Sequence, residues 1–211
     1  MFFKVEPSWR ILAKNKCRAS KEEFLTVLTG YGKRTRIRTY SLLGTRGDAD
    51  FMVWSICDSL ETLQEFHSDI LRTHLGKHVS TPYSYLAMSR HSEYFGSPPD
   101  PEPVGSKYLF VYPFTKKREW YSLPFEERRE MMKEHVRVGQ KFPSVTIHTG
   151  YSFGLDDYEF VLSFETDQAA DFSNLVMELR SSQASRYTAV ETPIFTCLAV
   201  DPQKMLGLLG P

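Results

Sequence analysis

Residues 108 to 157 carry the clearest pattern of secondary structure in this sequence. They contain YLFVYPFTKKREWY at 108–121, MMKEH at 131–135, VTIH at 145–148 and GLDD at 154–157. Alternating side chains predict a β-strand over 108–114. The spacing of apolar residues predicts a helix over 126–140. A strand and a helix followed by a second strand and a turn begin a β-α-β-β-α-β unit.

The remaining patterns complete this unit and repeat it. In the second half we predict strands at 145–149, 159–164 and 193–200 and a helix at 170–180. In the first half we predict strands at 9–13, 36–43, 50–57 and 83–88 and helices at 21–31 and 60–74. Ser20 and Glu23 have the spacing of a capping box, which predicts that the first helix begins at Lys21.

This layout predicts an α+β fold made of duplicated ferredoxin-like units. Each half is expected to form a four-stranded antiparallel sheet with helices on one face, and the two sheets are expected to pack together as an α+β barrel. Two dipeptides support the duplication, because Tyr-Ser at 40–41 and Thr-Pro at 81–82 both recur 111 residues later.

The predicted domain boundaries follow a Pro-rich segment. Residues 92–106 hold four prolines and two glycines, which is typical of a linker. We therefore expect an N-terminal half over 1–91 and a C-terminal half over 107–211.

Composition excludes several classes of protein. The 211 residues carry 26 Lys and Arg against 26 Asp and Glu, so the basic excess typical of nucleic-acid binding is missing. No apolar run reaches the roughly 18 residues of a membrane span, and the N-terminal residues do not resemble a secretory signal. Cys17, Cys57 and Cys197 are odd in number and scattered, which indicates reduced thiols in the cytoplasm.

Two side chains of the central stretch are candidates for chemistry. Tyr112 shares a strand face with Tyr108, Phe110 and Phe114. It is either a rim tyrosine with its hydroxyl in water or a redox-active phenol over a pocket. Lys116 belongs to a short basic run, which is either a solvated loop or the source of a partner for a carboxylate.

Two histidines likewise allow either a structural or a functional interpretation. His135 falls on the apolar side of its predicted helix, where it is either a hydrogen-bonded core residue or a ligand to iron. His148 alternates with Val145 and Ile147. If Val145 and Ile147 face the helices, His148 faces the interior of the barrel. There it is either an acid–base group beside a bound oxidant or a polar residue on a sheet face that is partly exposed to water. Arg180 and Ser185 end a predicted helix and have side chains that can donate to carboxylates.

The motifs in this order resemble a known family. YPFTK with the following EWY, the MMKEH helix, GLDD and ELR-x4-SRY are similar to the chlorite dismutase superfamily, and most like its coproheme decarboxylases, the peroxide-dependent haem synthases of bacteria. The resemblance is close over about residues 80 to 200 and agrees with the duplicated layout of the whole chain.

The resemblance implies a role for each candidate. His135 matches the proximal iron ligand, and Tyr112 matches the tyrosine that forms a radical and takes hydrogen from a propionate. Lys116 matches a basic residue near the reacting propionate, and Trp120 matches an aromatic at the porphyrin edge. Propionates would be held by Arg180 and Ser185.

The resemblance also implies a reaction and an assembly. Two propionates of iron-coproporphyrin III (coproheme) would be oxidised to vinyl groups with hydrogen peroxide, which gives haem b. It further implies a homopentamer with haem in the C-terminal half only, and the pathway suggests transient contact with a coproporphyrin ferrochelatase.

His148 departs from the family pattern. At this distance after the proximal ligand, chlorite dismutases carry an arginine and many decarboxylases a glutamine. A histidine would suit deprotonation of peroxide, and the loss of arginine counts against chlorite decomposition. Three alternatives stay open: a chlorite-degrading haem protein, a non-catalytic haem binder or sensor, and an α+β barrel that binds no haem.

Overall fold

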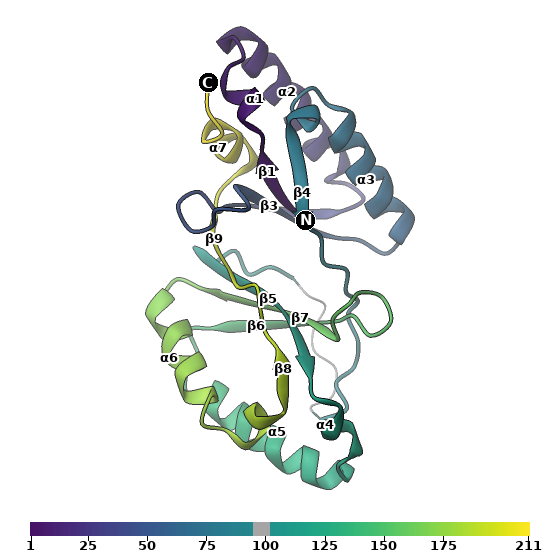
Figure 1. Cartoon of the computed structure of the whole chain (residues 1–211), viewed down its shortest axis with the longest axis vertical. Coiled ribbons are helices and arrows are strands. Elements are labelled where there is room, and N and C mark those ends of the chain that lie inside the picture. The colour runs from purple at the N-terminus through teal and green to yellow at the C-terminus, as the bar shows by residue number, and fades with distance from the viewer. Residues whose placement is uncertain (95–101) are drawn as a thin grey trace. The chain divides into compact units, whose positions relative to one another are not determined.

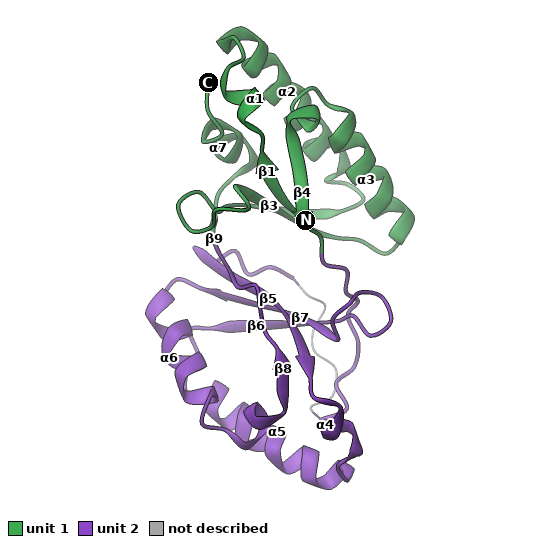
Figure 2. Cartoon of the chain, in the orientation of Figure 1, with its two compact units in different colours: residues 1–84, 197–211 green, residues 85–196 purple. Residues whose placement is uncertain are grey.

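The chain divides into two compact units. In this computed structural model, which describes residues 1–94 and 102–211, the first unit comprises residues 1–84 and 197–211 and the second comprises 85–196 (Figure 2). The C-terminal residues 197–211 therefore group with the first unit, and not with the predicted second half. Part of the predicted linker at 92–106 lies outside the described residues.

The first unit is an antiparallel sheet with helices. Its strands, in the order in which they pair, are β4 (Val79–Tyr83), β1 (Phe2–Val5), β3 (Phe51–Ile56) and β2 (Arg36–Ser41), and the end of β9 (Phe195–Ala199) pairs with β2 (Figure 1). Its helices are α1 (Pro7–Arg10), α2 (Lys14–Tyr31), α3 (Leu60–Arg72), the 3-10 turn η1 (Gly76–His78) and α7 (Pro202–Gly207). A core centred on Phe3, Phe24, Phe51, Phe66 and Ile70 joins the sheet to α2 and α3.

Three predictions for this unit were wrong. The strand expected at 9–13 is the helix α1, in which Pro7 stands at the first turn and the Trp9 indole donates to the Leu209 carbonyl at 2.8 Å. Ser20 does not cap a helix, because it lies inside α2 and its hydroxyl donates to the Lys16 carbonyl at 2.7 Å. The strand expected at 83–88 is β4, which ends where that range begins, and Met88 forms only an isolated bridge with Tyr151.

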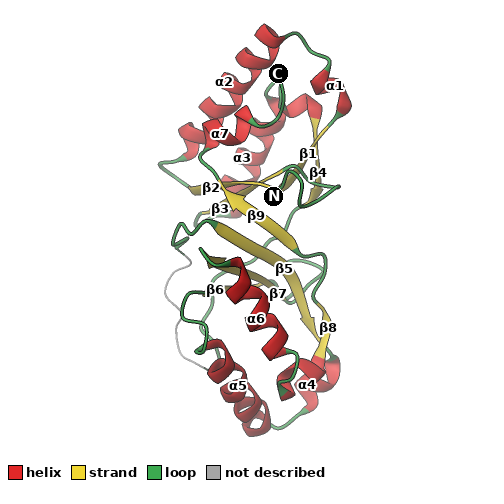
Figure 3. Cartoon of the chain, turned by 90° about the vertical axis from the view of Figure 1, so that its left-hand side faces the viewer, coloured by secondary structure: helices red, strands yellow, loops and turns green. Residues whose placement is uncertain are grey.

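The second unit carries the central stretch. Its strands pair antiparallel in the order β8 (Thr188–Val190), β5 (Tyr108–Lys116), β7 (Phe160–Thr166) and β6 (Thr146–Tyr151). Its helices are α4 (Arg118–Ser122), α5 (Phe125–Gly139), α6 (Ala169–Leu179) and the 3-10 turn η2 (Gln183–Tyr187). The longer helices α5 and α6 lie on the same side of the sheet (Figure 3).

The two faces of this sheet differ in character. On the face that α6 covers, the Phe110 ring stacks on Phe172 at 4.0 Å and the Tyr112 ring stacks on Phe164 at 5.5 Å. The register places Val111 opposite Ser163 and Leu109 opposite Glu165, so the opposite face carries two polar side chains of β7. Strand alternation therefore separates an aromatic face toward the helices from a partly polar face behind it.

Helix α5 is much less covered than α6. No residue of α5 is fully buried, whereas α6 buries Phe172 and Leu175. On the helix side of β6, Ile147 is 46% exposed and Thr149 is also exposed. Helix α5 and this exposed part of β6 thus lie on the same side of the unit, and Val138 of α5 packs against the hydrophobic cluster of Phe110 and Tyr112.

The described helices are too short or too polar to cross a membrane.

Candidate functional site

Tyr112 lies within a paired strand, not at a solvated rim. Strand β5 continues through Pro113, which pairs with Val161, and ends only at Lys116. The Tyr112 side chain is 7% exposed. Burial raises the pKa of its phenol, and the carboxylate of Glu191 raises it further against the opposing effect of Arg180. Tyr112 is therefore a neutral phenol throughout the physiological pH range.

Lys116 points back into the unit. Its ammonium donates to the Ala184 carbonyl at 2.9 Å and lies 4.4 Å from the ring centre of Trp120. Burial lowers the pKa of Lys116 to about 8, and the Glu159 carboxylate opposes this shift. Lys117 and Arg118, the other two members of the basic run, are exposed. The solvated-loop interpretation fits these two residues and not Lys116.

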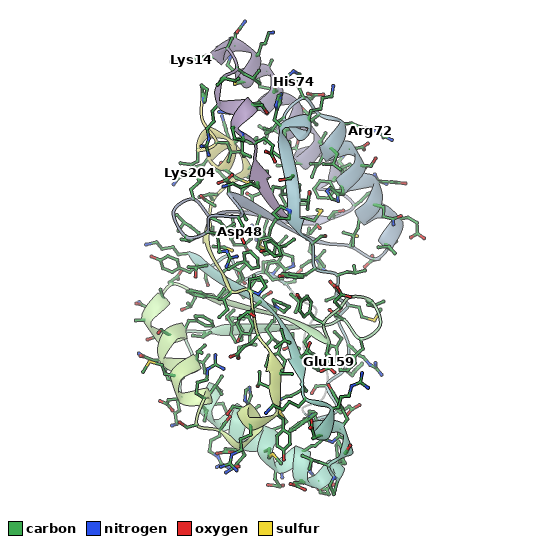
Figure 4. All side chains as sticks on the ribbon, in the orientation of Figure 1. Lys14, Asp48, Arg72, His74, Glu159 and Lys204 are labelled. Atoms are coloured by element: carbon green, nitrogen blue, oxygen red, sulfur yellow. The ribbon has the colours of Figure 1, made fainter. Side chains whose placement is uncertain are left out.

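Trp120 anchors the short helix that follows Lys116. It is buried in α4, and its ring lies 5.4 Å from that of Tyr187 in η2. Glu159, which precedes β7 and is labelled in Figure 4, also belongs to this site, although no sequence motif indicated it. Its carboxylate accepts from the Lys116 backbone N–H at 2.8 Å and from the Tyr121 hydroxyl at 2.6 Å. Glu159 thereby fixes the end of β5, at the Lys116 backbone, relative to α4.

His135 sits in the middle of α5 as a neutral imidazole. Burial, and to a smaller extent the nearby Lys116 ammonium, lowers its pKa to about 4 against the opposing effect of Glu134. Among the described residues, its buried Nδ1 has no hydrogen-bond partner. A core histidine normally has one. A neutral imidazole with an unsatisfied nitrogen matches the chemistry of a metal ligand better than that of a packing residue.

The structure does not bring His148 to this place. On β6, His148 pairs with Ser163 and shares its face, whereas Ile147 pairs with Phe164 and faces the helices. His148 Nε2 lies 3.1 Å from the carboxylate of Glu165, which is 1% exposed. The expected alternation is correct, but it puts the sheet between His148 and both Tyr112 and His135. His148 therefore does not lie beside Tyr112 and His135, where its expected acid–base role would put it.

Arg180 and Ser185 lie at the C-terminal end of α6 and in the following turn η2. Arg180 caps the C-terminus of α6 and forms an ion pair with Glu191. The Ser185 hydroxyl in η2 donates to the backbone carbonyls of Arg180 at 2.8 Å and Ser182 at 2.7 Å. Ser185 thus holds the turn that connects α6 to η2.

These residues fit an iron porphyrin with acidic side chains. Helix α5 is loosely covered and Ile147 is exposed, so both offer apolar surface. His135 on α5 adds an imidazole with an unsatisfied nitrogen. Lys116 and Arg180 supply cations that suit carboxylates. A flat apolar group with a metal and carboxylate arms meets all of these features.

The pKa of His135 predicts how the protein without ligand responds to acid. Because the unfolded chain takes up a proton near pH 6.5 and the folded chain only near pH 4, stability falls as the pH falls between these values. We expect His135→Leu to match or exceed the wild type at pH 7, and to exceed it by about a further 2 kcal/mol at pH 5. Urea unfolding of both proteins at the two pH values measures this difference. An equal loss in both proteins would show that His135 is not held neutral by burial.

Comparison with known proteins identifies the family. The family model described as chlorite dismutase matches residues 17–200. A protein named coproheme decarboxylase from Mycolicibacterium smegmatis is 37% identical over 174 residues, which cover 81% of this chain and 75% of that protein.

Solved structures agree on the fold. A chlorite dismutase mutant from Candidatus Nitrospira defluvii superposes with a TM-score of 0.92 at 25% identity and covers 98% of this chain and 92% of its own. The same organism's chlorite dismutase in complex with imidazole gives a TM-score of 0.91 at 25% identity, with the same coverage of 98% and 92%. These matches confirm the predicted α+β fold of duplicated ferredoxin-like units, and the chain belongs to the chlorite dismutase family.

Proposed function

We propose that this protein is a coproheme decarboxylase. It would convert two propionates of iron-coproporphyrin III to vinyl groups with hydrogen peroxide and release haem b. The relative from M. smegmatis supports an enzyme of this type. The observation that carries the proposal is that Tyr112 faces the same side of one sheet as α5, the helix that bears His135, while Lys116 ends the same strand as Tyr112.

His135 would bind the iron of the substrate. Its imidazole is already neutral at physiological pH, so ligation does not compete with a proton. Bound coproheme supplies the iron that reacts with peroxide, and the chain supplies ligation, orientation and charge.

Tyr112 would remove the hydrogen. In each event a propionate loses one hydrogen atom from its β-carbon to a Tyr112 radical, then one electron and CO2, and the vinyl group remains. One peroxide takes up the two electrons and, with two protons, forms two water molecules. The buried, neutral phenol suits transfer of a hydrogen atom, because the hydrogen stays on the oxygen until the radical forms.

The remaining predicted residues would hold the substrate. Lys116 and Arg180 are the cations for propionate carboxylates, and Ser185 supports the turn beside Arg180. Trp120 would border the porphyrin edge while its ring keeps Lys116 in place. These roles place the porphyrin in the second unit.

The pKa of Lys116 predicts a pH dependence of substrate binding. Because this pKa is about 8, the ammonium is charged below that pH and loses its proton above it. We expect the affinity for coproheme to fall as the pH rises from 7 to 9, by roughly tenfold for one lost contact between a cation and a carboxylate. Spectrophotometric titrations across this range test the effect. Lys116→Met should abolish this dependence, and an unchanged dependence in that variant would assign the titration to another group.

The proposed reaction is tested by following the porphyrin mass. The protein is loaded with ferric coproporphyrin III, titrated with hydrogen peroxide and sampled by mass spectrometry. Two successive losses of CO2 plus two hydrogens, through a three-propionate intermediate, are the expected result. Bound coproheme that keeps its mass would contradict the proposal and favour a haem binder or, if chlorite then releases oxygen, a chlorite-degrading enzyme.

We also propose three features that follow from the family. The working form would be a homopentamer, the enzyme would act in the cytoplasm, and a coproporphyrin ferrochelatase would deliver the substrate by transient contact. The free thiols of Cys17, Cys57 and Cys197 are consistent with a reducing compartment. Light scattering during size-exclusion chromatography measures the oligomer directly.

A further inference from the structure

The cation that would hold a propionate already has a carboxylate partner. Arg180 at the end of α6 forms an ion pair with Glu191, which directly follows β8. Strand β8 pairs with β5, with Val190 opposite Thr115, so the antiparallel register carries Glu191 back along the strand toward Tyr112. Glu191 raises the pKa of the Tyr112 phenol and Arg180 lowers it, in agreement with a pair that lies near the proposed reacting group.

The ion pair between Arg180 and Glu191 is weak enough for another carboxylate to replace Glu191. The Arg180 side chain is 50% exposed and that of Glu191 is 27% exposed. Ion pairs with this much access to water contribute little to stability and are easily replaced. A second carboxylate that reached Arg180 would form the same kind of contact that Glu191 makes.

We propose that Glu191 is a specificity-determining residue, an internal carboxylate that occupies Arg180 until a propionate of the substrate displaces it. This inference rests on the proposed function, because it takes an acidic porphyrin as the ligand. A porphyrin with a free carboxylate at this position restores the charge pairing of Arg180. A porphyrin without one leaves Arg180 with Glu191 and gains nothing from the guanidinium.

Two consequences follow from this role, and the second separates it from general repulsion. Removing the charge of Glu191 should strengthen binding of carboxylated porphyrins only, since an uncharged arm never competes for Arg180. The gain should also require Arg180 itself, because Glu191 acts through that guanidinium. Coupling between the two positions is therefore expected, and a double-mutant cycle measures it.

The test is a set of Soret titrations with ferric coproporphyrin III and its tetramethyl ester. We expect Glu191→Gln to bind coproheme about fivefold more tightly than the wild type and to bind the ester equally well. Glu178→Gln is the matched control, because Glu178 lies on α6 and pairs with Lys141 at 2.6 Å. It should leave both affinities unchanged. In an Arg180→Gln background, Glu191→Gln should have no further effect.

Several outcomes would overturn this role. They are an unchanged or weaker affinity of Glu191→Gln for coproheme, an equal gain for the ester, and a gain that persists without Arg180. Glu191→Ala, checked for folding by circular dichroism, must show the same direction. If the wild type decarboxylates coproheme and Glu191→Gln behaves like it, only the role of Glu191 fails. If the wild type does not bind coproheme, the proposed function fails as well.

Discussion

Tyr112→Phe should bind coproheme with nearly wild-type affinity and lose decarboxylation by at least about a thousandfold. The ring would keep its stacking on Phe164 at 5.5 Å, so the strand should stay intact. Only the phenolic hydroxyl is removed, and with it the proposed route by which oxidation reaches the propionate. Single-turnover assays with peroxide measure the rate, and a Soret titration measures binding.

A matched control is available on the same strand. Tyr108 shares the face and the hydrophobic cluster of Tyr112, so Tyr108→Phe makes the same chemical change away from Lys116 and Arg180. It should turn over normally. Comparable activity in Tyr112→Phe and the wild type would remove Tyr112 from the mechanism.

His135→Leu should weaken coproheme binding by at least about a hundredfold and change the spectrum of the bound iron. Loss of an outer-sphere partner alone costs metal sites about 10- to 100-fold, and loss of the ligand itself should cost more. Leucine has a similar volume, and the imidazole Nδ1 it replaces has no partner among the described residues, so the helix should be retained. Soret titration and resonance Raman spectroscopy of the iron–histidine bond measure the two effects.

The control for His135 lies on the other face of the sheet. His148→Gln keeps a hydrogen-bond donor for Glu165 and should bind coproheme like the wild type. If His148→Gln lost the iron spectrum and His135→Leu kept it, the porphyrin would lie on the opposite face from the one proposed here.

Local patterns predicted much of the second unit. Alternation of aromatic and aliphatic residues along β5 is a property of neighbouring side chains, so it located the strand and the shared face of Phe110 and Tyr112. The apolar spacing of MMKEH likewise predicted α5 with His135 turned inward. The short apolar run at 9–13 misled, because such a run does not distinguish a strand from a helix.

The place of His148 could not be predicted from alternation alone. The sequence indicates that His148 and Ile147 lie on opposite faces, and the structure agrees. Which of these two sheet faces meets α5 depends on how the helix packs on the sheet. No residue of α5 is fully buried, and such loose packing is a property of the tertiary structure. For this reason the sequence did not reveal that the sheet separates His148 from Tyr112 and His135.

Contacts between residues far apart in the chain could not be predicted from the sequence either. Glu159 meets Lys116 through the pairing of β5 with β7, and Glu191 approaches Tyr112 through the unexpected strand β8. Glutamate is too common for either position to be distinguished by residue type. Its importance appears only once strand register is known.

The most direct test of the central claim is freeze-quench electron paramagnetic resonance of coproheme-loaded protein mixed with peroxide. We expect a tyrosyl radical signal in the wild type and in Tyr108→Phe that decays as the three-propionate product forms. The signal should be missing from Tyr112→Phe. A tyrosyl signal of wild-type intensity in Tyr112→Phe, followed by normal decarboxylation, would contradict the assignment of Tyr112 as the residue that takes hydrogen from the propionate.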